Sequence, residues 1–370
     1  MVTNALAQNV AQAISDFDGI AAAIADKGVD IPVGTPTASY PDLIRSIQGS
    51  ETETSGVPRW VMDVWNSAPE VEGYTKRCIF VFVDSAASVT LSNGGYFITS
   101  DGYSGGATPH TWDTSKDIDR GEGFKTRWYI SYSIPAGRNV SLQLWPSPCL
   151  YFYGGDVNIT YFELAISTAQ NHTLEHVDFD ECATTSLSDM GNVLNGCTRL
   201  KSITIPRGVV LFGANNDGSP TVSSPNLNAV RMPGGTVETL RANALGGAPG
   251  LETFAIPGGV KVVEMAAFGT GMKHVSIPAS VISINNHSFM LCKGLRTVEI
   301  EDGWALPNNI SLSVSNVMSV SGLIALLNRL GATATARTIT LHPNTKTALL
   351  AHPDGSAAIA SANSNGVTIA

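Results

Sequence analysis

The sequence predicts a mainly β fold with an N-terminal α-helical segment, a β-sandwich and, after it, a solenoid of short repeats. Three observations lead to this prediction. Apolar residues recur at helical spacing near the N-terminus, β-branched and aromatic runs fill the region that follows, and a short motif then recurs six times. The 370 residues are 43% hydrophobic and 14% charged, so the composition is that of a folded protein rather than a disordered one.

Residues 1–50 form the predicted helical segment. Its apolar residues fall on one face of a helix, and Pro41 suits the first position of a second, short helix. The residues on these faces are Leu6, Val10, Ile14, Phe17, Ile20, Ile24, Leu43, Ile44 and Ile47. Such an apolar stripe has little of its own chain to bury against, so we predict a segment for attachment or oligomerisation. Packing of the stripe against the downstream domain is the alternative.

Residues 51–165 are predicted to form a small antiparallel β-sandwich. Five of the six Trp and eight of the nine Tyr lie here, in β-branched and aromatic runs separated by Gly, Pro and Asn. Trp112 and Trp128 are candidates for stacking against a sugar on the surface. The alternative is that these rings belong to the core, which alternation along a strand favours.

An internal repeat is the strongest signal in the sequence, and it predicts a leucine-rich-repeat solenoid over 166–302. A pattern of the form Leu-x-x-Val-x-Ile begins at Leu174, Leu200, Leu227, Leu251, Met272 and Leu295. The starts are 26, 27, 24, 21 and 23 residues apart, within the about 20–29 residues of leucine-rich repeats. A second pattern, Val-x-x-Ile-x-x-x-Ala-Phe, keeps phase with the first. Each repeat should bury its apolar face only by stacking on its neighbours.

Polar residues beside the repeats are the candidates for surface recognition. The segment 213–225 interrupts the repeat and is predicted to be a surface loop, with Asn215, Asn216 and Asp217 as candidate contacts. His176 and Asp178 flank an inward Val and are expected to point outward. Residues 303–370 are predicted to form a C-terminal cap with a helix over 321–330 and a strand over 337–341.

Signatures of catalysis are missing from the sequence, so we expect no enzyme, no catalytic residue, no cofactor and no metal. The sequence has no GxSxG, P-loop or HExxH pattern. His172, His176 and the acidic residues that follow resemble a set of metal ligands, and the two His would share one face of a helix. A strand is expected here instead, so we do not expect these side chains to form a metal site. A glycan-degrading enzyme stays an alternative because glycosidase carboxylates follow no fixed local spacing.

Charge and hydropathy narrow the range of partners. The net charge of -9 disfavours a duplex nucleic-acid binder, which needs a cationic surface. The longest uncharged stretch, 305–328, is too polar to span a bilayer, so no membrane insertion is expected. The first twenty residues lack a secretory signal, which predicts assembly in the cytoplasm.

The two repeat patterns together, clearest from Leu251 to Ile300, resemble the BspA-like leucine-rich repeats of gut and oral bacterial surface proteins. The same repeats occur in tail and fibre proteins of phages that infect such bacteria, and the resemblance covers 174–300. The opening AIADKGVDIPVGTPTASYPDLIRSI is similar to a short helix-turn-helix module of phage virion proteins. SVSGLIALLNRL and SANSNGVTIA look like a phage end module, although Asn365-Gly366-Val367 replaces its usual Lys-Gly-Trp.

This resemblance implies a phage virion structural protein of the tail-fibre or head-fibre type, assembled in the host cytoplasm. We expect a homotrimeric fibre or spike that its N-terminus anchors to other virion proteins of the tail, collar or capsid. Its repeats would bind a glycan or protein on the host cell surface. The alternatives are a capsid decoration protein without a receptor and a bacterial cell-surface adhesin. Bacterial members usually carry a signal sequence and an anchor. Neither is recognised in this sequence, which favours the phage branch.

Overall fold

A computed structural model describes the protein between residue 57 and the C-terminus. The described residues are 57–83, 88–90, 95–106, 109–119, 125–133, 139–143, 149–155, 158–163, 174–179, 182, 184, 190, 197–213, 222–232 and 235–370. The predicted helical segment 1–50 lies outside these residues, with its apolar positions from Leu6 to Ile47, so its attachment role stays a prediction. The described part is mainly β, which confirms the predicted class.

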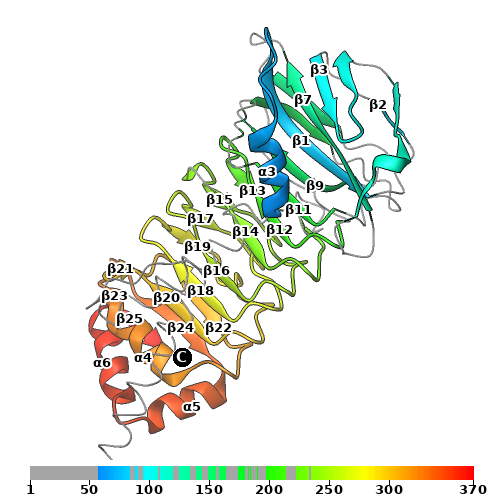
Figure 1. Ribbon diagram of the computed structural model, residues 1–370. Helices are drawn as coiled ribbons and strands as arrows, with labels where there is room; N and C mark the ends of the chain where they lie inside the picture. Colours follow the sequence, from blue (N-terminus) through cyan, green and yellow to red (C-terminus); the bar gives the residue numbers. More distant parts are fainter. Residues whose placement is uncertain are drawn as a thin grey trace, which may run out of the picture.

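The N-terminal region contains one helix and a large sheet (Figure 1). Its elements are α3 (Arg59–Ser67), β1 (Thr75–Val83), β2 (Ser88–Thr90), β3 (Gly95–Thr99), β4 (Ser104–Gly106), β5 (Pro109–Thr111), the 3-10 helix η2 (Thr114–Lys116), β6 (Ile118–Asp119), β7 (Lys125–Ser133), β8 (Asn139–Gln143), β9 (Cys149–Gly154) and β10 (Asn158–Glu163). The large sheet also takes in three repeat strands, β11 (His176–Asp178), β12 (Ser202–Thr204) and β14 (Ala229–Arg231). It runs in the order β14-β12-β11-β9-β1-β7-β3-β4, and β6 also pairs with β7. Two further pairs, β2 with β5 and β8 with β10, lie outside it.

Strand β9 joins the aromatic-rich region to the repeats. It pairs antiparallel with β1 on one side and parallel with the first repeat strand, β11, on the other. All six of its residues are buried. One sheet therefore crosses residue 165, where the sequence predicts a boundary between a sandwich and a solenoid. The four-part division of the chain itself stays a prediction.

Helix α3 covers one face of the large sheet, where the sequence pattern predicted strands and no helix. The helix follows Pro58 and buries Val61, Met62 and Trp65 on one side. Its Trp65 ring meets Tyr153 of β9 edge to face, with 5.3 Å between ring centroids. Helix α3 therefore packs on this face, while the opposite face of the sheet belongs to the repeat core.

The repeats stack as two ladders of short parallel strands. Their strands are β11 (His176–Asp178), β12 (Ser202–Thr204), β13 (Leu211–Phe212), β14 (Ala229–Arg231), β15 (Thr239–Leu240), β16 (Thr253–Ala255), β17 (Val262–Val263), β18 (His274–Ile277), β19 (Ser283–Ile284) and β20 (Thr297–Ile300). The first ladder contains β11, β12 and β14 in the large sheet, then β16-β18-β20 as a separate sheet. The second ladder is β13-β15-β17-β19. Both predicted sub-patterns thus form strands, one in each ladder.

Apolar side chains from both ladders fill the space between them. In the first ladder Phe254, Val275 and Val298 lie in register and are buried. The turns after the second ladder add Phe268 and Phe289, whose rings stack with 5.0 Å between centroids. A single cluster connects these residues with the inner face of the large sheet, and a second, smaller cluster lies on the opposite face beneath α3.

The five cysteines are all buried thiols. Cys197 and Cys292 hold the same place in two repeats, three residues before the repeat leucine, and both are fully buried. Burial raises the pKa of each of these two thiols to about 12. They serve as small apolar side chains of the core.

The C-terminal region closes the far end of the repeat array (Figure 1). Its elements are β21 (Trp304–Ala305), β22 (Ile310–Leu312), α4 (Val320–Arg329), β23 (Leu330–Gly331), β24 (Arg337–Leu341), α5 (Pro343–Ala351), α6 (Gly355–Ser364) and β25 (Val367–Ile369). The predicted helix and strand are confirmed as α4 and β24, while α5 and α6 were not predicted. Ser319 caps α4 by accepting from the Gly322 N–H. Within the described residues, no helix has the length and apolar character needed to cross a membrane.

Close approach of neighbouring repeats gives a test on two adjacent glycines. A Cβ on Gly259 would lie 1.9 Å from the Gly235 carbonyl oxygen, whereas one on Gly258 would meet no heavy atom within 4 Å. We expect Gly259→Ala to lower the free energy of unfolding by about 1–3 kcal/mol, because the repeats must move apart. Gly258→Ala should leave it unchanged or raise it by up to about 1 kcal/mol. Urea unfolding measures both, and equal effects would contradict this packing.

Candidate binding surfaces of the repeat domain

The predicted surface contacts fall into different places. Asn215, Asn216 and Asp217 lie outside the described residues, so they stay candidates. His176 is partly buried at the junction between the large sheet and the repeats. Its ring lies 5.5 Å from that of Tyr151, and its Nδ1 is 2.7 Å from the Ser202 hydroxyl oxygen. It therefore contributes to packing between β9, β11 and β12.

The environment of His176 favours its neutral form. Burial, followed by the positive charge of Lys201, lowers the pKa of His176 from 6.5 to about 4, while Glu175 acts in the opposite direction. Glu175 is itself buried and forms salt bridges with both Arg199 and Lys201. The Lys201 Nζ lies 2.6 Å from the Glu175 Oε2. These charged groups are thus arranged around the start of the first ladder.

Asp178 and Trp112 are not on the surface, which corrects two of the predicted contacts. Asp178 is 1% exposed, although strand alternation places it on the outward face. It pairs in register with Tyr153, whose ring packs against Trp65, so α3 covers this end of the face. Trp112 is 4% exposed and belongs to the core.

Trp128 is partly buried and packs against the cluster beneath α3. Aromatic residues of this region are therefore used for packing, which was the alternative expectation. A residue pattern with a period of two predicts which face a side chain occupies, but not whether a helix covers that face.

Polar clusters in the large sheet also serve the fold. Burial raises the pKa of Asp101, but hydrogen bonds lower it by more, so the pKa lies below its usual value. Thr99, His110 and the Asp113 N–H all donate to the Asp101 carboxylate. Within the part of the chain that the structure describes, no group of three or more His, Cys, Asp or Glu side chains could hold a metal ion.

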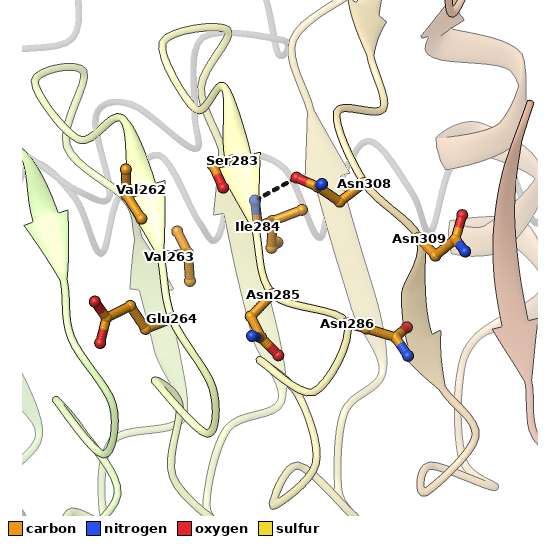
Figure 2. Close-up of a pocket in the computed structure, with 9 residues that line it drawn as sticks. All are labelled: Val262, Val263, Glu264, Ser283, Ile284, Asn285, Asn286, Asn308 and Asn309. Atoms are coloured by element: carbon orange, nitrogen blue, oxygen red, sulfur yellow. Dashed lines mark hydrogen bonds between the residues drawn. The ribbon is translucent and has the colours of Figure 1, made fainter. Parts of the chain in front are cut away.

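A groove with both polar and apolar lining groups lies along the second ladder, where it approaches the C-terminal region (Figure 2). It has a volume of about 390 Å³, which is within the size of pockets that hold small ligands. The lining residues are Val262, Val263, Glu264, Ser283, Ile284, Asn285, Asn286, Asn308 and Asn309. They come from strands β17 and β19, from the residues that follow these strands, and from the segment before β22.

Backbone N–H groups fix three of the four asparagine side chains of the groove. The Oδ1 of Asn308 accepts from the Ile284 N–H at 3.3 Å, drawn as a dashed line in Figure 2. The Oδ1 of Asn309 accepts from the Thr338 N–H at 2.9 Å, and that of Asn285 from the His287 N–H at 2.9 Å. Each bond uses one lone pair of a carboxamide oxygen and fixes the orientation of the amide, so its Nδ2 stays a donor toward solvent or a ligand.

Glu264 supplies the acceptor in this groove. The Ala242 N–H donates to its Oε2 at 3.0 Å, so the carboxylate is held in place as well. Ser283 adds a hydroxyl that can donate or accept. Val262 is half-buried and adds an aliphatic side chain to the lining, whereas Val263 and Ile284 are each 1% exposed and belong to the core beneath it.

The repeat pattern did not predict this groove. The sequence does contain two Asn-Asn pairs, at 285–286 and 308–309, that mark its polar side chains. The first pair follows a strand of the second sub-pattern, and the second pair follows Pro307 outside any repeat pattern. Their proximity depends on how the chain passes from the last repeat into the C-terminal region, and residue spacing does not show that.

Comparisons with known proteins agree with the repeat prediction. Residues 222–313 match the BspA type Leucine rich repeat region in six copies. The resemblance expected over 174–300 is therefore confirmed for the shared range 222–300. The matched range is a part of the chain and includes the groove.

Three crystal structures are similar to parts of the chain. A leucine rich cell surface protein from Faecalibacterium prausnitzii A2-165 has 20% identity and a TM-score of 0.26, and the match covers 30% of this chain and 29% of that chain. A leucine-rich repeat protein from Bacteroides ovatus has 18% identity and a TM-score of 0.28, with 42% of this chain and 38% of that chain covered. The leucine-rich repeat protein of T. pallidum has 16% identity and a TM-score of 0.33, with 59% of this chain and 91% of that chain covered. The similarity spans less than half of the first two proteins. No curated protein matches the chain.

The position of His176 predicts how stability depends on pH. Because its pKa in the folded state is lowered to about 4 from 6.5, the unfolded chain binds a proton that the folded chain does not. The stabilisation is complete above pH 6.5 and is lost as pH falls toward about 4. We expect His176→Asn to flatten the slope of unfolding free energy against pH in this window.

The matched control is His274→Asn. His274 is exposed and makes the equivalent hydrogen bond, from Nδ1 to the Thr297 hydroxyl, at 2.8 Å. This variant removes a histidine with the same kind of partner from an exposed site, so the slope should stay close to that of the original protein. Equal slopes for the original protein and His176→Asn would contradict the assigned role of His176.

Proposed function

We propose that this chain is a binding protein that presents its repeat domain to a partner surface. The observation that carries the proposal is the groove, in which backbone N–H groups hold polar side chains in fixed orientations on a stacked array. Stacked repeats are well suited to binding because each repeat is supported by its neighbours and outward residues are free to vary.

Binding rather than catalysis suits the chemistry of the groove. Glycoside hydrolysis needs a pair of carboxyl groups about 5–9.5 Å apart. Among the described residues that line the groove, Glu264 is the one carboxylate, and the other polar groups are amides and a hydroxyl. Amides and a hydroxyl orient a ligand through hydrogen bonds but do not exchange protons with it near neutral pH.

In the finer form of the proposal, the chain is a fibre or spike of a phage virion with a leucine-rich solenoid. Residues 1–50 would attach it to other virion proteins and bring copies together, as a homotrimer. Support comes from the apolar stripe of that segment and from the similarity of the N-terminal and C-terminal sequences to phage virion modules. The partner surface would then be a glycan or protein of the host cell.

A bacterial cell-surface adhesin is the second candidate, and the match of residues 222–313 to BspA type repeats favours it equally. A capsid decoration protein would use the same modules without a host receptor. The three candidates differ in where the chain resides and in whether it binds cells.

Two measurements on the source culture separate these candidates. We expect quantitative mass spectrometry to find the chain in purified phage particles, at low copy number relative to the major capsid protein. We also expect the purified, fluorescently labelled chain to bind host cells, with binding lost when unlabelled chain is added in excess.

Each other outcome has a definite meaning. A copy number that scales with the capsid lattice, without binding to cells, would identify a decoration protein. Presence in the cell envelope and not in particles would identify an adhesin. Absence of cell binding together with absence from particles and envelope would overturn the proposed binding function in all its forms.

A further inference from the structure

We propose that the groove at the end of the second ladder binds an uncharged oligosaccharide. The inference rests on the proposed binding function and names its ligand class. Its basis is the juxtaposition of anchored amide donors, an anchored carboxylate and the aliphatic side chain of Val262 around one cavity (Figure 2).

The donors come from the three anchored carboxamides. Asn285, Asn308 and Asn309 each use Oδ1 to accept a backbone N–H, so the orientation of the amide is set before any ligand arrives. Each Nδ2 is then a donor with a fixed direction. Groups that are already ordered lose little conformational freedom on binding, which favours affinity.

Hydroxyl groups are the ligand chemistry that matches this lining. A sugar hydroxyl can accept from an amide and at the same time donate to the carboxylate of Glu264. The C–H face of a sugar ring can pack against the half-buried side chain of Val262. The volume of about 390 Å³ admits a short saccharide segment rather than a large planar cofactor.

Ionic ligands fit this lining less well. A calcium ion needs six to eight oxygen ligands, and Glu264 is the one carboxylate among the described residues of the lining. An anion would meet the Glu264 carboxylate, and the described lining contains no Lys, Arg or His to offset that charge. A neutral ligand avoids both costs.

An extended peptide is also disfavoured. Peptides that add to a sheet need unpaired backbone groups at a strand edge. The N–H groups of Ser283 and Asn285 donate to carbonyl oxygens of the preceding repeat, and the N–H of Ile284 donates to Asn308. A strand added at this edge of β19 would therefore have to displace the Asn308 carboxamide.

The test uses the full chain on an array of neutral, sulfated and carboxylated oligosaccharides. The variants are Asn285→Asp, Asn308→Asp and Asn309→Asp, because aspartate keeps the oxygen that accepts the backbone N–H and removes the Nδ2 donor. Asn228→Asp is the matched control, since Asn228 is an exposed asparagine of the repeats outside the groove.

We expect binding to neutral members of the array, weakened about tenfold or more in each groove variant. The control should bind like the original chain, and thermal unfolding should show that all variants remain folded. Affinity is then measured by calorimetry with the best neutral oligosaccharide of the array.

Three results would overturn the inference: no binding to neutral oligosaccharides, binding to acidic members alone, or neutral binding that the groove variants leave unchanged. Cell binding separates this failure from that of the proposed function. A chain that binds cells equally well with and without the groove substitutions would keep its binding function and lose this ligand assignment. A chain that binds neutral oligosaccharides through the groove but no host cell would keep the ligand and lose the receptor role.

Discussion

Parallel pairing of short strands between successive repeats is the interaction on which the rest of this structure depends. Each strand has two to four residues, so a single repeat could bury little of its own apolar surface. Stacking brings residues such as Val263 and Ile284 into register and closes a continuous core between two ladders. The same close stacking limits side-chain size at the turns, where Gly259 meets the backbone of the preceding repeat.

At the N-terminal end, the same strand pairing joins the aromatic-rich region to the repeats. Strand β9 offers one edge to β1 and the other to β11, so the antiparallel sheet becomes the first rung of the array. Helix α3 then covers the outer face at that end, and His176 becomes an internal contact. At the opposite end, α4 to α6 provide the cap that an exposed core requires (Figure 1).

The groove arises where the second ladder stops. After β19 the next turn of the chain contains Pro307, which has no backbone N–H, and no strand pairs with β19 on that side among the described residues. The carboxamide of Asn308 replaces the missing strand by accepting the Ile284 N–H. A backbone requirement of the fold thus orients the same side chains that line the groove.

The sequence by itself determined the elements that depend on local periodicity. Leu251, Met272 and Leu295 mark the repeats because burial of one strand face imposes a regular spacing on apolar residues. The same reasoning placed α4 and β24. Tertiary structure alone decided which outward residues remain exposed. Asp178 has the spacing of a surface residue but is buried beside Tyr153, on the face of the sheet against which α3 packs. The groove required it too, because Asn285 and Asn308 meet through a long-range connection that no local spacing encodes.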